Sequence, residues 1–205
     1  MRSWVEINSQ ALKHNLSRVK ALAPNSRVVA MVKTNAYGHG LLHCAKALEE
    51  ADYFGIATLE EAVALRNNGV ATPILLMPGF QNKEELELLE QYQIDAVVYD
   101  TFQLELLKKT QKTVKVWLKF ETGMHRLGFV PELAQTAISQ ALAMPHVKVM
   151  ALMTHFACAD SSDPTMSEAQ MQAFTKLVKG HDIPLSVSSS SAVLRYPQWS
   201  YDYIR

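Results

Sequence analysis

The sequence predicts an α/β fold and, within that class, a (β/α)8 TIM-type barrel. Short apolar runs alternate with amphipathic segments along the chain, which is typical of parallel strands connected by helices. Seven such runs follow one another at a spacing of roughly 20–35 residues, which favours a barrel over the alternative, a doubly wound open sheet. The barrel should be incomplete, because 205 residues fall short of the about 250 that a full barrel usually takes.

The predicted strands are apolar on both faces. Most of the runs contain no regular alternation of polar and apolar residues, as expected of parallel strands that are covered on both sides. The runs are residues 27–33, 53–58, 73–79, 94–100, 114–120, 147–156 and 184–190.

The segments between these runs carry helix signals. Thr58 is a capping residue with Glu61 three positions later, a pair that typically begins a helix. Pro131 suits a first helical turn, and Gly180 suits a helix end. The predicted helices are residues 39–51, 58–69, 81–92, 101–111, 131–143 and 165–180.

The last apolar segment of the chain is "YDYIR", residues 201–205. It begins like a further strand and then stops. We therefore expect one barrel domain over residues 1–205 that lacks its last strand.

Composition and charge exclude several classes of partner. Basic and acidic residues number 20 each, so no net field attracts nucleic acid or an anionic membrane. No segment approaches the roughly 18 consecutive apolar residues of a membrane span, and residues 1–16 contain no apolar signal core. The two cysteines, Cys44 and Cys158, favour a reducing compartment over a disulfide framework. The sequence predicts a cytoplasmic protein that binds neither nucleic acid nor membrane.

Polar and charged side chains follow the carboxyl ends of four predicted strands. Active sites of barrels form at these ends, so we expect the side chains to converge at one mouth. They are Lys33 after the first strand, Arg126 in the loop after the fifth, His155 after the sixth and the serines at 188–191 after the seventh.

Each of these residues also has a purely structural interpretation. A lysine at a strand end often extends to solvent, and a lone histidine there is usually structural. Arg126 could pair with Glu121, and serines that precede a helix are common N-caps. Their occurrence at corresponding strand ends favours a shared site.

The chemistry of this set leaves two possibilities open. A lysine beside an apolar wall loses charge by desolvation, which makes its amine a better nucleophile toward an aldehyde. Serines and backbone N–H groups at the start of a helix can hold a phosphate, and lysine with a phosphate cradle fits pyridoxal phosphate. An aldolase that forms a Schiff base directly with its substrate would need the same lysine and no cofactor.

Five segments resemble motifs of the bacterial alanine racemase family, in the family's order. The segment "VVAMVKTNAYGHG", residues 28–40, resembles the pyridoxal phosphate attachment signature and is highly specific. The other segments are "LKFETGMHRLGF", "MTHFACAD", "SSSSAVLRYP" and "YDYIR". Together the five motifs span nearly the whole chain.

The resemblance implies a fold-type III enzyme, in which a barrel that binds pyridoxal 5'-phosphate precedes a β-rich C-terminal domain. Such an enzyme works as a homodimer and interconverts L-alanine and D-alanine by two-base proton transfer, which supplies D-alanine for peptidoglycan. The second base is a tyrosine of the partner subunit's C-terminal domain, which residues 1–205 lack. We therefore expect these residues alone to be nearly inactive.

The resemblance also implies roles for individual residues. Lys33 matches the lysine that carries the cofactor and serves as one base, and Tyr37 matches a tyrosine at the phosphate. Arg126 matches the arginine that meets the cofactor phenolic oxygen and the substrate carboxylate. His155 matches the histidine beside the cofactor ring, and Lys119 a lysine that is carbamylated in some members.

The remaining matches lie near the end of the chain. Ser190 matches the phosphate-binding serine, and Ser189 occupies the position of a usual asparagine. Arg205 matches the arginine that faces the pyridine nitrogen. Because arginine accepts no proton, that nitrogen would stay largely unprotonated, which favours racemisation over transamination.

Some positions depart from the family pattern, and two alternatives within the resemblance stay open. Glu121 replaces the usual aspartate, and His125 stands where a small or polar residue is common. The first alternative is a non-enzymatic module of a related barrel family that binds pyridoxal phosphate. The second is a racemase that accepts serine or several amino acids.

Overall fold

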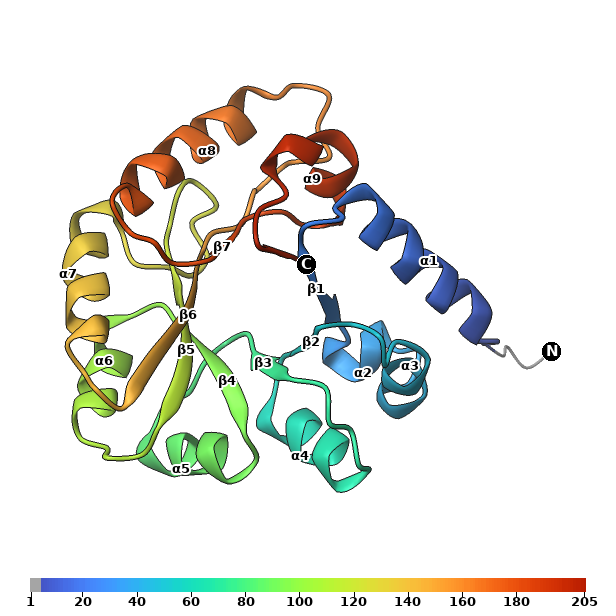
Figure 1. Ribbon diagram of the computed structural model, residues 1–205, viewed down its shortest axis with the longest axis horizontal. Helices are drawn as coiled ribbons and strands as arrows, with labels where there is room; N and C mark the ends of the chain where they lie inside the picture. Colours follow the sequence, from blue (N-terminus) through green and yellow to red (C-terminus); the bar gives the residue numbers. More distant parts are fainter. Residues whose placement is uncertain (1–4) are drawn as a thin grey trace.

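The computed structural model describes residues 5–205 as a closed barrel of parallel strands with helices outside it (Figure 1). The predicted barrel fold is confirmed, and the doubly wound sheet is excluded. Within the described residues, the strands are β1 (Arg27–Met31), β2 (Tyr53–Ile56), β3 (Ile74–Leu76), β4 (Ile94–Val98), β5 (Val114–Lys119), β6 (Val147–Met153), β7 (Leu185–Ser186) and β8 (Tyr203–Ile204).

Helix α1 precedes β1, and the later helices connect successive strands. The helical elements in chain order are α1 (Ser9–Leu22), α2 (Lys33–Tyr37), α3 (Leu41–Ala47), α4 (Leu59–Asn67), α5 (Lys83–Gln91), α6 (Thr101–Lys108), α7 (Pro131–Leu142), α8 (Thr165–Val178), α9 (Ser190–Arg195) and the 3-10 turn η1 (Pro197–Trp199). All seven predicted strands and all six predicted helices are present, with bounds a few residues shorter than expected.

The barrel is complete, so the prediction that it lacks its last strand was wrong. The short strand β8 pairs with β1, where Arg27 lies opposite Tyr203, and with β7, where Ser186 lies opposite the same tyrosine. Its flanking residues add hydrogen bonds, from Arg27 N–H to the Asp202 carbonyl at 2.8 Å and from Arg205 N–H to the Ser188 carbonyl at 2.9 Å. Two residues are enough for closure because both neighbouring strands pair with them. Figure 1 shows the C-terminal end beside β1.

Helix α1 was not predicted, because its sequence is mostly polar. It begins after Asn8, whose side-chain oxygen accepts the N–H of Ala11 at 3.0 Å. Leu16 is its buried residue, and the helix packs against α3 and α9. It thereby covers the seam where the first and last parts of the barrel meet.

Strand side chains alternate between two cores. On β5, Val116 and Leu118 face the layer between barrel and helices, whereas Trp117 fills the barrel interior. The interior core consists of Val29, Tyr53, Leu75, Val97, Trp117, Ala151, Met153 and Tyr203. This alternation decides which side chains reach the mouth of the barrel.

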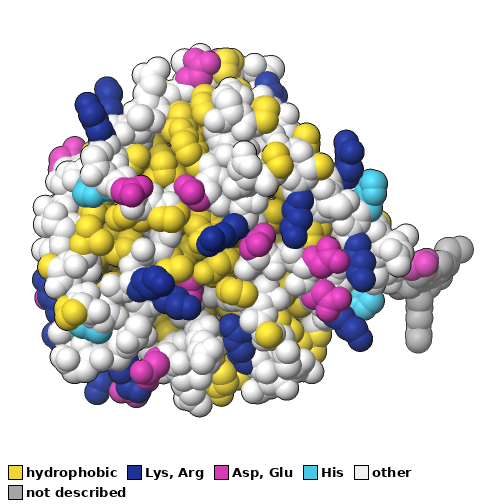
Figure 2. Space-filling view, in the orientation of Figure 1, with side chains coloured by type: hydrophobic (Ala, Val, Ile, Leu, Met, Phe, Trp, Pro, Cys, Tyr) yellow, Lys and Arg dark blue, Asp and Glu magenta, His cyan; other side chains and the backbone are white. Residues whose placement is uncertain are grey.

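The surface shows no field of one charge on the face drawn in Figure 2, where basic and acidic side chains of the described residues are interspersed. Across residues 5–205, none of the helices combines the length and apolarity needed to cross a bilayer.

Candidate active site

Four polar side chains reach the barrel mouth from the ends of four strands. Each comes two positions after an apolar strand residue that belongs to the barrel interior or packs against it. The four residues are Lys33 after Met31, Lys119 after Trp117, His155 after Met153 and Arg205 after Tyr203. All of them line one cavity of about 660 Å³.

The cavity is strongly cationic. Besides the four residues above, it is lined by Tyr37, Arg126, Ser189 and Ser190, so the structure brings together all eight predicted site residues. Among the described residues that line it, none is aspartate or glutamate. Two lysines and two arginines without an acidic lining residue favour an anionic ligand in this cavity.

Lys33 begins a left-handed turn. The next three residues have φ and ψ values between 45° and 55°, and Tyr37 has a φ of 55°. An L-residue in this conformation costs about 1–2 kcal/mol, so the run stores strain directly after the lysine. The Lys33 amine lies 5.9 Å from the centre of the exposed Tyr37 ring.

Glu61 anchors this strained turn. One carboxylate oxygen accepts the N–H of Asn35 at 2.7 Å, and the other accepts the N–H of Ala57 at 2.9 Å. The side chain of Asn35 in turn accepts the N–H of Leu41 at 2.8 Å. The sequence predicted that Thr58 and Glu61 together begin a helix. They do, since the Thr58 hydroxyl accepts the Glu61 N–H at 3.3 Å, and the Glu61 side chain additionally anchors the turn.

Arg126 is presented by a loop that closes on itself after β5. The N–H of Glu121 donates to the Phe129 carbonyl at 2.9 Å, and the N–H of Phe129 donates to the Lys119 carbonyl at 2.8 Å. Gly128 permits this closure, because its φ is +144° and a Cβ there would lie 2.5 Å from the Glu121 nitrogen.

Glu121 stabilises the loop from within. Its carboxylate accepts the N–H groups of Gly123 and His125, the latter at 2.7 Å. Within the described chain it makes no ion pair with Arg126, so the structural alternative considered for that arginine is not realised. Arg126 is exposed at the cavity, where it can meet a ligand.

Arg205 is held by the ends of β6 and β7. Its guanidinium donates to the Ser186 hydroxyl, to the Thr154 carbonyl at 2.6 Å and to Nδ1 of His155 at 3.2 Å. Burial lowers the pKa of Arg205 to about 10, which still leaves it protonated at neutral pH. It therefore acts only as a donor.

His155 is neutral in this environment. Burial, followed by the positive charges of Arg205, Lys119 and Arg126, lowers its pKa to about 3. Because Arg205 donates to Nδ1, the ring proton lies on Nε2.

Lys119 is the most deeply buried cation of the mouth, with 5% of its surface exposed. Burial is the main cause that lowers its pKa to about 8, and Arg205 and Arg126 lower it further. About a tenth of this amine is thus unprotonated at pH 7, far more than for a lysine with an ordinary pKa.

The serines after β7 divide into two kinds. Ser188 is fully buried and donates to the Trp199 carbonyl at 2.8 Å, which is a structural role. Ser189 occupies the N-cap position of α9, but its side chain makes no capping hydrogen bond. The hydroxyls of Ser189 and of the exposed Ser190 therefore remain for a ligand in the cavity.

Sequence reasoning missed the residues that support this site from behind. Ser186 and Thr154 accept hydrogen bonds from Arg205. Gln170 donates to the Thr122 hydroxyl and to the His155 carbonyl. Their residue types carry no motif signal, because their role depends on contacts between distant parts of the chain.

The model of the family described as "Alanine racemase, N-terminal domain" matches residues 7–205. The chain belongs to this family. Among curated relatives, the alanine racemases of Shewanella woodyi and Coxiella burnetii are 45% and 42% identical over 98% and 100% of this chain. The chain spans 57% of the length of each.

Solved structures of the alanine racemase family have the same fold. The enzyme from Acinetobacter baumannii superposes with a TM-score of 0.87 and 36% identity, over 97% of this chain and 60% of that one. The biosynthetic alanine racemase from Pseudomonas aeruginosa gives a TM-score of 0.90 and 35% identity, over 96% of this chain and 56% of that one.

Proposed function

We propose that the chain is the cofactor-binding barrel of an alanine racemase, an isomerase that interconverts L-alanine and D-alanine. The observation that carries this proposal is the convergence of Lys33, Arg126 and Arg205 on one cavity without an acidic lining residue among those described. Such a cavity suits a phosphate-bearing cofactor together with the carboxylate of an amino acid.

The residues of the cavity fit pyridoxal phosphate. Lys33 would hold the cofactor aldehyde, Tyr37, Ser189 and Ser190 would hold its phosphate, and Arg205 would face its ring nitrogen. When bound, pyridoxal phosphate supplies an electron sink that acidifies the α-hydrogen of an amino acid. Because Arg205 has no acceptor atom and its guanidinium donates to three oxygens, it cannot accept a hydrogen bond from a protonated ring nitrogen and would leave that nitrogen unprotonated.

Two residues handle the substrate in this proposal. The exposed Arg126 guanidinium binds the substrate carboxylate, and the amine of Lys33 holds or removes the proton on one face of the α-carbon. His155 would lie beside the cofactor ring. A pKa of about 3 and an occupied Nδ1 make it unsuitable as a base near neutral pH.

Racemisation requires proton transfer on both faces of the α-carbon. We assign the second face to a tyrosine that lies outside residues 1–205 and comes from the second subunit of a homodimer. The chain spans 57% of its curated relatives, which leaves room for such a residue in the remaining portion. Residues 1–205 alone should therefore racemise alanine very slowly.

Lys119 is a candidate for carbamylation. The neutral amine attacks the carbon of carbon dioxide and releases one proton to solvent, and a pKa of about 8 provides part of Lys119 in that neutral form at neutral pH. The resulting carboxylate would place an acceptor beside Arg126 and Arg205, where the described residues offer little negative charge.

The unpaired Cys44 and Cys158 support a location in the reducing cytoplasm.

A racemisation assay tests the proposed function. Conversion of L-alanine to D-alanine is measured with added pyridoxal phosphate for residues 1–205 alone and for the same chain joined to the remaining portion of the Shewanella woodyi relative. We expect turnover in the joined protein, little in residues 1–205, and none in the joined Lys33→Ala variant. L-serine as a second substrate measures specificity.

Three results would contradict the proposal. A folded joined protein that binds pyridoxal phosphate without racemising alanine would indicate a binding module. A protein that shows no visible absorbance with the cofactor but cleaves aldol substrates would indicate an aldolase. Full turnover by residues 1–205 would contradict the need for a second base outside them.

A further inference from the structure

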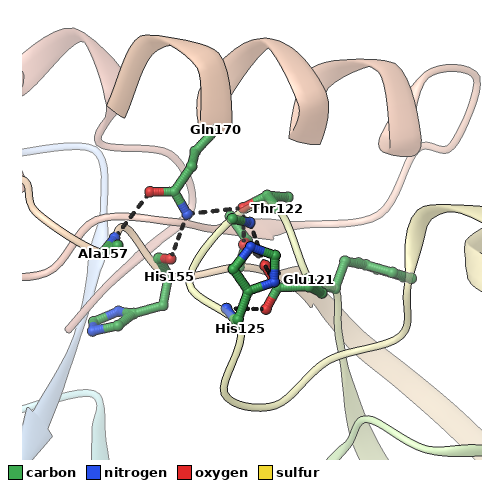
Figure 3. A network of polar contacts seen from close by, with 9 residues as sticks. Glu121, Thr122, His125, His155, Ala157 and Gln170 are labelled. Atoms are coloured by element: carbon green, nitrogen blue, oxygen red, sulfur yellow. Dashed lines mark hydrogen bonds and ion pairs between the residues drawn. The ribbon is translucent and has the colours of Figure 1, made fainter. Parts of the chain in front are cut away.

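Gln170 is a fully enclosed side chain directly behind the site. It lies on α8, only 1% of its surface is exposed, and all of its polar atoms are used. Its Oε1 accepts the N–H of Ala157 at 2.9 Å, and its Nε2 donates to the Thr122 hydroxyl at 3.2 Å and to the His155 carbonyl at 3.1 Å. Figure 3 shows these three bonds spreading from one amide to two segments of the chain.

The two segments are those that carry Arg126 and His155. Thr122 begins the loop after β5 that presents Arg126, and the carbonyl and N–H on the other side belong to the segment after β6. Between them, the hydroxyls of Thr122 and Thr154 form a hydrogen bond at 2.7 Å.

The loop is shaped to rest on Gln170. Gly123 has a φ of +137°, and a Cβ there would lie 3.2 Å from Cγ of Gln170. The adjacent Glu121 carboxylate fixes the N–H groups of Gly123 and His125, as Figure 3 also shows. These hydrogen bonds fix the turn between Thr122 and Arg126, so the position of Thr122 determines where the turn presents Arg126.

Only an amide satisfies this arrangement. One oxygen must accept from Ala157, while one nitrogen must donate to a hydroxyl and a carbonyl at the same time. An ionised glutamate of the same shape cannot donate to the His155 carbonyl and would bury a charge there, and a protonated one has a single donor for the two acceptors.

We propose that Gln170 is a positioning residue that sets the spacing between Arg126 and His155, and thereby aligns the substrate carboxylate with the cofactor ring. This inference rests on the proposed function for the identity of the ligand. The geometric part, a clasp between the segments after β5 and β6, stands on the hydrogen bonds alone.

Gln103 provides a matched control. It is also fully buried, its oxygen accepts the N–H of Tyr99 at 2.8 Å, and its nitrogen donates to the Phe80 carbonyl at 3.1 Å. It therefore joins the segments after β3 and β4 in the same way, but those segments do not carry Arg126 or His155. A general loss of packing should affect both glutamines alike.

The experiment compares Gln170→Glu, Gln170→Met and Gln103→Glu with the parent in the joined protein described above. Hydrogen–deuterium exchange across 121–126 should accelerate in both Gln170 variants, because both lose the amide donor to Thr122. Exchange at Ala157 should accelerate in Gln170→Met, which removes its acceptor, and both regions should stay unchanged in Gln103→Glu. The KM for alanine should rise about tenfold in the Gln170 variants, the size expected for one displaced hydrogen-bonding group, with a smaller change in kcat. All of these variants should still capture pyridoxal phosphate at Lys33, as measured by visible absorbance.

The outcomes separate the two proposals. Unchanged exchange at Ala157 in Gln170→Met, unchanged exchange across 121–126 in both Gln170 variants, or equal changes in KM for the Gln170 and Gln103 variants would overturn the positioning role. If both Gln170 variants fail to fold while Gln103→Glu folds, Gln170 is a general structural residue and the proposal falls. If the parent does not racemise alanine but exchange changes as expected, the clasp stands and the proposed function fails.

Discussion

The guanidinium of Arg205 donates to Nδ1 of His155 across 3.2 Å. This bond fixes the histidine tautomer, with its proton on Nε2, and directs a permanent positive charge at the ring. It links the ends of β6 and β8, which are the strands that carry the two residues. The proposed site therefore contains a histidine that is oriented by an arginine and kept neutral mainly by burial, with the arginine charge as a second cause.

Replacement of Arg205 should raise the pKa of His155. In Arg205→Met the charge is lost, but burial is the largest cause of the low value, so the pKa should rise and remain below that of an ordinary histidine. NMR titration of the imidazole measures it. Arg195→Met is the control, since Arg195 is exposed on α9. An unchanged His155 pKa in Arg205→Met would contradict the assigned relationship.

Lys119 should destabilise the ligand-free protein at neutral pH. Its folded pKa of about 8 lies below the ordinary 10.5, so between these values the unfolded chain binds a proton that the folded chain does not. Below pH 8 the penalty is fully present, and it disappears as the pH rises to 10.5. Lys119→Met should therefore stabilise the protein by on the order of 1–3 kcal/mol at pH 7.

Urea unfolding at a series of pH values measures this difference, which should shrink above pH 8. The buffers must be free of carbon dioxide, because carbamylation would remove the penalty. Labelled carbon dioxide should give a carbamate NMR signal that Lys119→Met lacks. A less stable Lys119→Met variant at pH 7 in carbon dioxide-free buffer would refute this electrostatic account.

Glu61 should be needed to keep the left-handed turn after Lys33. In Glu61→Ala the N–H groups of Asn35 and Ala57 lose their acceptors, which should cost about 1–3 kcal/mol of stability. The turn can then relax, and capture of pyridoxal phosphate by Lys33 should slow. The matched control is Glu60→Ala, because Glu60 is the exposed neighbour of Glu61. Stopped-flow absorbance compares the two, and equal capture rates would show that the turn does not depend on Glu61.

Much of the fold could be predicted from the sequence because the strands of a covered barrel are uniformly apolar. The exceptions have physical reasons. The polar sequence of α1 has only a narrow apolar side, with Leu16 buried. The sequence of residues 201–205 indicates the beginning of a strand, but β8 has only two residues, Tyr203 and Ile204, so the sequence did not indicate that so short a strand closes the barrel. Its existence depends on pairing with β1 across the whole length of the chain.

Only those residues of the site that lie at strand ends or in family motifs could be predicted from the sequence. Lys33 and His155 are conspicuous because each is a polar residue directly after an apolar strand. The contact of Gln170 with Thr122 joins residues 48 positions apart, and the left-handed conformation after Lys33 follows from bonds to the distant Glu61. Buried Asp95, which accepts the Tyr53 hydroxyl at 3.1 Å inside the barrel, was not predicted for the same reason.

The central claim is that Lys33 is the residue that captures pyridoxal phosphate. Borohydride reduction of the protein with bound cofactor, followed by proteolysis and mass spectrometry, locates the modified lysine directly. We expect the label on the peptide that contains Lys33, with none on Lys119, and loss of the label in Lys33→Ala. A label on another lysine, or no label in a protein saturated with the cofactor, would contradict the account.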